Sequence, residues 1–259
     1  MLTLPNHDLE ILPSPELAAE AAARHFVKAA GIAIRSRGRF VVALAGGSTP
    51  RNMYARLAAL PLIRDVDWPR VEVLWGDERC VPPDEEASNY RMACEALLDH
   101  VPADPTRLHR IRGEDPPVEA AKSYEEEIRT LLGAPSGPPS GAPIDLVLLG
   151  LGQDGHTASL FPRGAWLHDS VSWVRAEYSQ AMAQWRVTLT PVLINAAAEV
   201  VFLVVGGAKA SIVRQVLEGP SRPAQLPAQA IAPAAGRVRW ILDAAAAADG
   251  RFDPALLSR

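Results

Sequence analysis

Cysteine and lysine are the scarce residues of this sequence. Its only cysteines are Cys80 and Cys94, and two thiols with no CxxC spacing and no histidine at ligand spacing predict neither a disulfide framework nor a zinc site. Lysine supplies three of the 26 cationic side chains, at Lys28, Lys122 and Lys209. In a chain that almost always uses arginine, a lysine marks a position where arginine does not fit, or it is there by chance.

Long apolar runs and a basic leader are also lacking. The longest strongly apolar run, Val200–Ala208, is far shorter than the roughly 18 residues that a membrane span needs. Residues 1–11 contain Asp8 and Glu10 and have no basic segment, unlike a signal peptide. We therefore expect a soluble, cytoplasmic protein with reduced thiols that contacts no membrane.

Neither sign of charge dominates. The 26 cationic and 30 anionic side chains give a net charge of −4 and a pI of about 5.9. There is no run of like charge, so the composition argues against a nucleic-acid partner.

Apolar residues make up 48% of the chain. The 18 glycines and 23 prolines together number 41, a share below that of low-complexity sequences.

The length of 259 residues and the apolar content predict a sizeable core, and we interpret residues 1–259 as a single domain. The segment Gly133–Pro143 (GAPSGPPSGAP) has the composition of a flexible surface loop. Because the strand pattern resumes directly after it, we interpret this segment as an insertion within the domain.

Short apolar runs alternate with stretches of helical periodicity. Strands that are buried on both faces read as continuous apolar runs, and parallel sheets are built from such strands. We expect strands at Phe40–Ala45, Val71–Trp75, Asp145–Leu149, Val200–Val205 and Val238–Leu242, and helices at Pro15–Arg35, Asn52–Leu60, Ser88–His100, Val118–Leu132 and Ala208–Leu217. This alternation predicts an α/β fold of a modified doubly wound type, with a mostly parallel sheet and helices on both faces.

Three polar segments follow predicted strands, at the ends where open α/β sheets bind ligands. In the first (AGGSTP), Gly46 and Gly47 let the chain turn tightly and approach a ligand. Ser48 or Thr49 is the expected N-cap and Pro50 the first helical residue. Free N–H groups and the helix dipole favour an anion there, typically a phosphate. The alternative is an ordinary capped helix start.

The second segment, Trp75–Pro82 (WGDERCVP), brings Asp77, Glu78 and Arg79 to a strand end. An acid beside an arginine can orient polar substrate groups or neutralise an anion, so we expect Asp77 and Arg79 to contact the ligand. A solvated loop with an internal ion pair is the alternative. Downstream, Ser88-Asn89 is expected to cap the next helix.

The third segment (GLGQDGHTASLFP) contains GxGxxG, the pattern of a dinucleotide fingerprint. Pro162 and Gly164 interrupt the helix that such a fingerprint requires, so we expect no dinucleotide cofactor. An acid–base site fits better. His156 stands in a glycine-rich loop open to water and can take a proton at neutral pH. Asp154 can fix its tautomer or hold a substrate hydroxyl.

Two more cations follow later strands. Arg186 opens the polar strand Arg186–Thr190, and Lys209 follows VGGA at the start of another helix. A lysine, as a compact point charge, suits a phosphate at a helix start. An ordinary surface cation is the alternative.

Taken together, AGGSTP, WGDERCVP with SN downstream, and GLGQDGHTASLFP resemble the 6-phosphogluconolactonase family, which is related to the glucosamine-6-phosphate isomerase/deaminases. The similarity runs from about Pro15 to Leu242. It implies a modified α/β fold with a mostly parallel sheet. It also implies hydrolysis of the 1,5-lactone of 6-phosphogluconate in the oxidative pentose phosphate pathway.

The resemblance also implies roles for single residues. It places the phosphate pocket on Gly46, Gly47, Ser48 and Thr49, with cations from Arg51, Arg79, Arg186 and Lys209, and the catalytic histidine on His156 with Asp154 beside it. Relatives often have lysine where this chain has Arg51. The related deaminases carry a glutamate just before the proline of the third segment, used in sugar ring opening. Phe161 occupies that position here and favours a lactonase.

The implied chemistry needs no cofactor and no metal. Neutral His156 takes a proton from the water that attacks C1 and returns it to the departing ring oxygen. Nearby N–H groups or Arg79 stabilise the oxyanion, at about 3 kcal/mol for each good donor. The expected partner is a small phosphosugar lactone, and a monomer is the default oligomeric state. The alternatives are an enzyme of the glucosamine-6-phosphate isomerase/deaminase type and a non-catalytic sugar-phosphate sensor.

Overall fold

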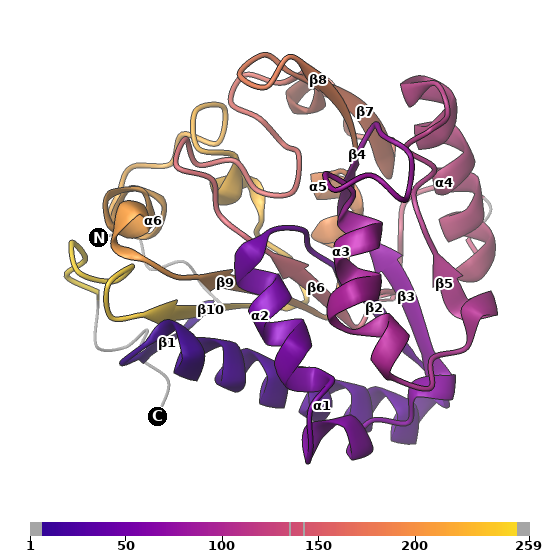
Figure 1. The fold of residues 1–259 in the computed structure, drawn as a ribbon. Coiled ribbons are helices and arrows are strands. Elements are labelled where there is room, and N and C mark those ends of the chain that lie inside the picture. Colours follow the sequence, from indigo (N-terminus) through magenta and orange to yellow (C-terminus); the bar gives the residue numbers. More distant parts are fainter. Residues whose placement is uncertain (1–6, 135, 142, 253–259) are drawn as a thin grey trace.

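A seven-stranded parallel sheet forms the centre of the protein (Figure 1). The computed structural model describes residues 7–134, 136–141 and 143–252. All neighbouring strands of the sheet run parallel. In spatial order they are β1 (His7–Leu12), β10 (Arg237–Asp243), β9 (Glu199–Val204), β6 (Leu146–Leu149), β2 (Phe40–Leu44), β3 (Val71–Trp75) and β5 (Leu108–His109). The predicted α/β fold with a mostly parallel sheet is confirmed, and the five predicted strands are all present.

A second, antiparallel sheet of three strands stands beside the first, in the order β4 (Asp77–Arg79), β8 (Gln184–Leu189) and β7 (Val174–Ser179). The sequence predicts only one strand of this sheet, Arg186–Thr190. The observed strand, β8, begins two residues earlier, at Gln184. The hairpin of β7 and β8 rises at the top of the molecule in Figure 1. β4 has only three residues, and β7 (VRAEYS) alternates polar and apolar residues, whereas the five predicted strands are continuous apolar runs.

The helices begin and end at local signals in the sequence. In order they are α1 (Pro15–Arg37), α2 (Ser48–Leu57), α3 (Asn89–Ala96), α4 (Pro117–Leu131), α5 (Pro191–Ile194) and α6 (Ala210–Glu218). The Ser14 hydroxyl caps α1 by accepting the Leu17 N–H, and Gly38, with φ of 77°, ends the helix. Ser88 caps α3 through the Arg91 N–H, at 3.1 Å, as expected.

The start of α2 differs from the prediction. Neither Ser48 nor Thr49 is the N-cap. That position belongs to Gly47, and Ser48 is already the first helical residue, so Pro50 lies in the first turn but not at its start. Gly47 has φ of 105°, a conformation that only glycine adopts without strain. A cap at Thr49 would make Pro50 the first helical residue. With Gly47 as the cap, the helix begins two residues earlier, at Ser48, and so closer to the strand.

The core fills the space around the central sheet. β2, β3 and β6 are buried along their whole length, and Phe202 of β9 stacks on Trp240 of β10 with ring centroids 4.0 Å apart. α1 packs on this sheet through Phe26, which meets Phe40 edge to face. Within 133–143, the described residues form no helix or strand, as expected for a loop. In the described chain, no helix is long and apolar enough to cross a membrane.

His109, on the edge strand β5, is held between two carboxylates. Its Nδ1 lies 2.7 Å from Glu127 of α4 and its Nε2 lies 3.1 Å from the buried Glu72 of β3. The hydrogen bond to Glu127 raises the pKa of His109, burial opposes this, and the bond to Glu72 raises it further. The protonated ring therefore ties α4 to β3 and β5.

Because its folded-state pKa is raised, His109 contributes stability that is complete below its unfolded pKa, near 6.5, and is lost as the pH rises through the folded value. We expect His109→Gln to lower the free energy of unfolding by about 1–2 kcal/mol at pH 6, and by less as the pH rises. Denaturant unfolding of both proteins across a pH series measures this. His100→Gln is the control, since that ring bonds to a main-chain carbonyl. A His109→Gln deficit that does not change with pH would contradict the prediction.

Candidate functional site

A cavity of about 350 Å³ opens where the carboxyl ends of β2, β3, β6 and β9 meet β4 and the β7–β8 hairpin. Parallel strands end at one edge of a sheet, so the loops that follow them are brought together there. The predicted site residues that line the cavity are Gly46, Gly47, Ser48, Thr49, Asp77, Arg79, Asp154, His156, Arg186 and Lys209. All three predicted segments therefore contribute to one site.

Arg51 is the predicted residue that the structure does not bring into the cavity. Its side chain is more than half exposed, and its guanidinium lies 3.7 Å from Glu95 of α3. The reason is helical geometry. Arg51 is the fourth residue of α2, so its side chain projects sideways from the helix, whereas the N–H groups of the first turn point along the helix axis.

His156 and Asp154 form a hydrogen-bonded pair. The ring Nδ1 lies 2.5 Å from the Asp154 Oδ1, and the same oxygen accepts the main-chain N–H of His156 at 3.2 Å. Burial opposes ionisation of Asp154, but the hydrogen bond to His156 and its charge lower the pKa of the carboxyl below its ordinary value. An ionised Asp154 accepts a hydrogen bond from Nδ1–H, and in this tautomer the neutral ring carries its lone pair on Nε2. This is the arrangement of an oriented general base.

Gly152 leaves room for this pair. A Cβ on Gly152 would lie 2.1 Å from Nδ1 of His156 and 2.7 Å from Oδ1 of Asp154. The Gly152 N–H donates to the His156 carbonyl at 2.8 Å, which closes the loop around the ring. On its other side the imidazole meets the Phe161 ring, with centroids 5.2 Å apart. Only a residue without a side chain lets His156 and Asp154 lie this close to the main chain at position 152, which explains the glycine in the motif.

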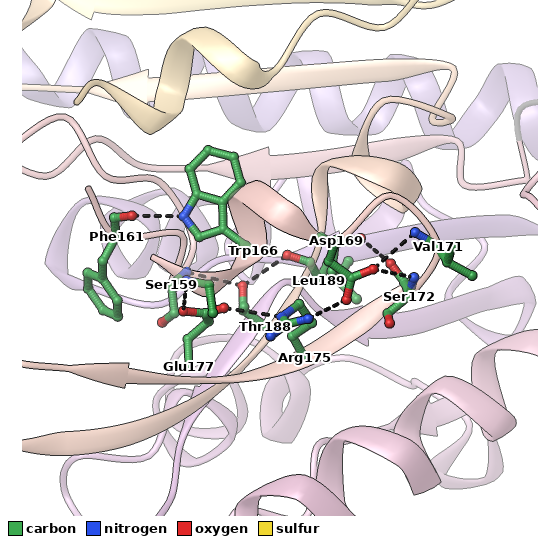
Figure 2. Close-up of polar contacts among 12 residues, drawn as sticks. Ser159, Phe161, Trp166, Asp169, Val171, Ser172, Arg175, Glu177, Thr188 and Leu189 are labelled. Atoms are coloured by element: carbon green, nitrogen blue, oxygen red, sulfur yellow. Dashed lines mark hydrogen bonds and ion pairs between the residues drawn. The ribbon is translucent and has the colours of Figure 1, made fainter. Parts of the chain in front are cut away.

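Asp77 joins three separate parts of the chain. Its Oδ2 accepts the Ser159 hydroxyl at 2.5 Å, and the Asn89 amide of α3 donates to its carbonyl at 2.8 Å. The Ser159 N–H in turn donates to the Thr188 hydroxyl of β8, as Figure 2 shows. Asn89 and Ser159 both line the cavity but were not predicted as site residues. Asn89 was expected to cap a helix, and nothing in the sequence pairs Ser159 with Asp77.

Three cations line the cavity without a carboxylate partner. In the described chain, no carboxylate oxygen lies within 4.0 Å of a side-chain nitrogen of Arg79, Arg186 or Lys209, whereas Arg175 and Arg239 each contact two or more acids. Burial lowers the pKa of Arg186, and the charge of Arg79 lowers it further. Burial also lowers the pKa of Lys209, against the attraction of Asp154. Unneutralised cations in a partly buried cavity favour an anionic ligand.

The first turn of α2 adds N–H groups to the same wall. Gly47, Ser48 and Thr49 line the cavity, and their main-chain N–H groups are those of a helix start, which have no intrahelical acceptor. These groups and the positive end of the helix dipole favour an anion. One wall of the cavity is therefore suited to a phosphate, and another carries the His156–Asp154 pair.

Comparison with known proteins agrees with these features. Residues 13–240 match the family described as glucosamine-6-phosphate isomerases/6-phosphogluconolactonase. The chain belongs to this family. Among curated relatives, a 6-phosphogluconolactonase of Nostoc sp. is 40% identical over 84% of this chain and 87% of its own length. One from Streptomyces coelicolor is 39% identical over 90% of each chain.

Solved structures of this family share the fold. The 6-phosphogluconolactonase from Trypanosoma cruzi superposes with a TM-score of 0.82 and 29% identity, covering 95% of this chain and 97% of that one. A monomeric glucosamine-6-phosphate deaminase superposes with a TM-score of 0.78 at 21% identity, over 93% of this chain and 99% of its own, which shows a common fold alone. The doubly wound α/β architecture is therefore shared by both branches of the family.

The close approach at Gly152 yields a prediction. Since real Cβ atoms stay beyond about 3.0 Å from such neighbours, Gly152→Ala must displace the His156 ring by about 1 Å and break its bond to Asp154. We expect the ring resonances of His156 to shift in ¹H–¹⁵N NMR spectra and the Nδ1–H signal of the bonded pair to be lost. Gly150→Ala is the control, because a Cβ there meets nothing within 4 Å. Unchanged His156 resonances in Gly152→Ala would show that the loop adjusts elsewhere.

Proposed function

We propose that this protein hydrolyses 6-phospho-D-glucono-1,5-lactone to 6-phosphogluconate, the carboxylic ester hydrolysis of the oxidative pentose phosphate pathway. Its curated relatives at 39–40% identity are 6-phosphogluconolactonases that it matches over most of both chains. The observation that carries the proposal is the pairing, within one cavity, of an oriented His156–Asp154 pair with cations that lack carboxylate partners. A phosphorylated ester needs both features.

In this proposal the phosphate binds at the start of α2. The N–H groups of Gly47, Ser48 and Thr49 donate to the phosphate oxygens, and Arg186 and Lys209 neutralise its charge. Binding energy collected at the phosphate orients the sugar ring without acting on the reacting carbon itself. Asp77, held by Ser159, accepts a hydrogen bond from a ring hydroxyl.

The proposed reaction needs a single base. His156 takes a proton at Nε2 from a water molecule as the water oxygen bonds to C1, and the carbonyl oxygen becomes an oxyanion. Arg79 and nearby N–H groups stabilise that charge. When the tetrahedral intermediate collapses, the bond from C1 to the ring oxygen breaks, and the imidazolium returns its proton to that oxygen. The products are the acid at C1 and a free hydroxyl at C5.

The second candidate is an isomerase or deaminase acting on an amino-sugar phosphate. Phe161 argues against it. Its phenyl ring packs against His156 at the position where the resemblance places an acid for ring opening. A phenyl group can neither donate nor accept a proton. The sensor alternative lacks a specific observation in its favour. A monomeric state, the absence of a nucleic-acid or membrane partner and the cytoplasmic location remain predictions from the sequence.

One assay tests the proposed function directly. We expect the purified protein to hydrolyse 6-phosphogluconolactone at a rate well above the spontaneous rate measured without protein. The rate is followed as NADPH formation by 6-phosphogluconate dehydrogenase, which oxidises the product. We expect no release of ammonia from glucosamine-6-phosphate under the same conditions. Ammonia release without lactone hydrolysis would reverse the assignment of the two candidates.

Substitutions separate the two parts of the site. We expect His156→Ala to lower kcat by about 100-fold or more, the usual contribution of a general base, with a small change in KM.

Lys209→Ala should instead raise KM by about 10- to 100-fold with a smaller change in kcat, because a charge-assisted hydrogen bond to phosphate contributes about 1.5–3 kcal/mol to binding. Steady-state kinetics on matched preparations measure both. Near-wild-type turnover by His156→Ala would rule out its role as the base.

A further inference from the structure

Arg186 is the one arginine of the described residues that is buried, with 4% of its surface exposed. Its guanidinium meets only neutral acceptors. Nη1 donates to the Gln184 side-chain oxygen at 2.7 Å and to the Trp185 carbonyl at 3.2 Å, and Nη2 lies 3.2 Å from the Met182 sulfur. A buried cation without a carboxylate is costly unless a ligand supplies the missing charge.

An acid stands directly opposite Arg186. In the register of the antiparallel sheet, Arg186 of β8 faces Glu177 of β7 on one side and Arg79 of β4 on the other. Residues paired in this way project from the same face of the sheet, with Cβ atoms about 4.5–5.5 Å apart. Glu177 is 4% exposed, so an ion pair between it and Arg186 would be buried from water. The structure does not contain this ion pair.

Glu177 is occupied by other partners. Its Oε1 accepts the Arg175 Nε–H at 3.2 Å, and its Oε2 accepts the main-chain N–H of Ala165, also at 3.2 Å. Arg175 is held in turn by Asp169, whose Oδ1 accepts the N–H groups of Val171 and Ser172. Figure 2 shows Arg175 between the two carboxylates. Each oxygen of Glu177 therefore has a donor, and among the described residues neither oxygen forms an ion pair with Arg186.

We propose that Arg175 is a positioning residue that holds Glu177 away from Arg186 and so keeps the guanidinium of Arg186 free for the anionic end of the substrate. This inference rests on the proposed function, since the anion is the phosphate of the phosphosugar lactone. Arg175 does not line the cavity, so its effect on substrate binding passes through Glu177 and Arg186. Asp169 anchors Arg175, and Gln184 supplies a neutral acceptor that orients Arg186 without neutralising it.

The decisive experiment removes Arg175 and then removes the acid that it holds. We expect Arg175→Met to raise KM for 6-phosphogluconolactone by about tenfold, the scale of one charge-assisted hydrogen bond, with kcat changed by less than about threefold. Freed Glu177 then pairs with Arg186 and competes with the phosphate. Adding Glu177→Gln to Arg175→Met should restore KM, because the competing charge is gone. Arg175→Lys, which keeps a cation beside Glu177, should stay near the wild-type value.

A merely structural role for Arg175 predicts a different result. If loss of Arg175 only loosened the sheet, a second substitution in the same network would lower stability further and would not restore KM. Thermal unfolding of each variant reports on stability separately. Arg24→Met is the matched control. It also frees a glutamate, Glu20, from an ion pair, on α1 and outside the cavity.

Binding measurements separate this inference from the proposed function. Calorimetric titration with 6-phosphogluconate and with inorganic phosphate should show weaker binding by Arg175→Met than by the wild-type protein and recovery of binding in the double variant. This holds whether or not the protein hydrolyses the lactone. If the wild-type protein binds these anions but does not hydrolyse the lactone, the proposed function fails and the role of Arg175 is still measured. The inference is overturned if Arg175→Met binds them as the wild-type protein does, if Glu177→Gln fails to restore binding, or if the wild-type protein binds neither anion.

Discussion

Parallel pairing of β2, β3, β6 and β9 is the constraint on which the site depends. Strands that share a direction end at one edge of the sheet, so the loops that follow them meet there although they are far apart in the sequence. These strands are held by the buried core on both faces. The polar groups of the cavity therefore rest on rigid elements, which fixes the distance between the α2 start and His156.

The electrostatics of the cavity follow from how its acids are partnered. Asp77 accepts from Ser159, Asp154 is paired with His156, and Glu78 accepts the N–H groups of Asn89 and Tyr90 at the start of α3. With these carboxylates engaged, the nearby cations keep their charge for a ligand. A net charge of −4 for the whole chain thus coexists with a local cationic wall. The overall charge argues against a polyanion but not against one phosphate.

Much of the fold was predictable because buried parallel strands are continuous apolar runs, as in Val71–Trp75 and Leu146–Leu149. β1, at the sheet edge, was missed because its HDLEIL alternates polar and apolar residues, the pattern of a half-exposed strand, and is not a continuous apolar run. The start of α2 was misplaced because a glycine with positive φ, and not a side chain, begins the helix. In the site, the segments were predictable, whereas the partners within it, such as Asn89 and Ser159 for Asp77, were not.

By itself the sequence determined what depends on near neighbours. Gly152, Asp154 and His156 lie within five residues, so their motif alone indicates an oriented histidine, and AGGS alone indicates a helix start that attracts an anion. Only the tertiary structure decided which charges meet. Arg51 belongs to the same segment as Ser48 yet pairs with Glu95, while Arg186 comes from a distant hairpin and joins the cavity. The reason is that the pairing of β4 with β8 places Arg79 beside Arg186, and no local sequence pattern shows which distant strands pair. The register of Glu177 with Arg186 is set within the β7–β8 hairpin, but only the fold brings that hairpin to the cavity.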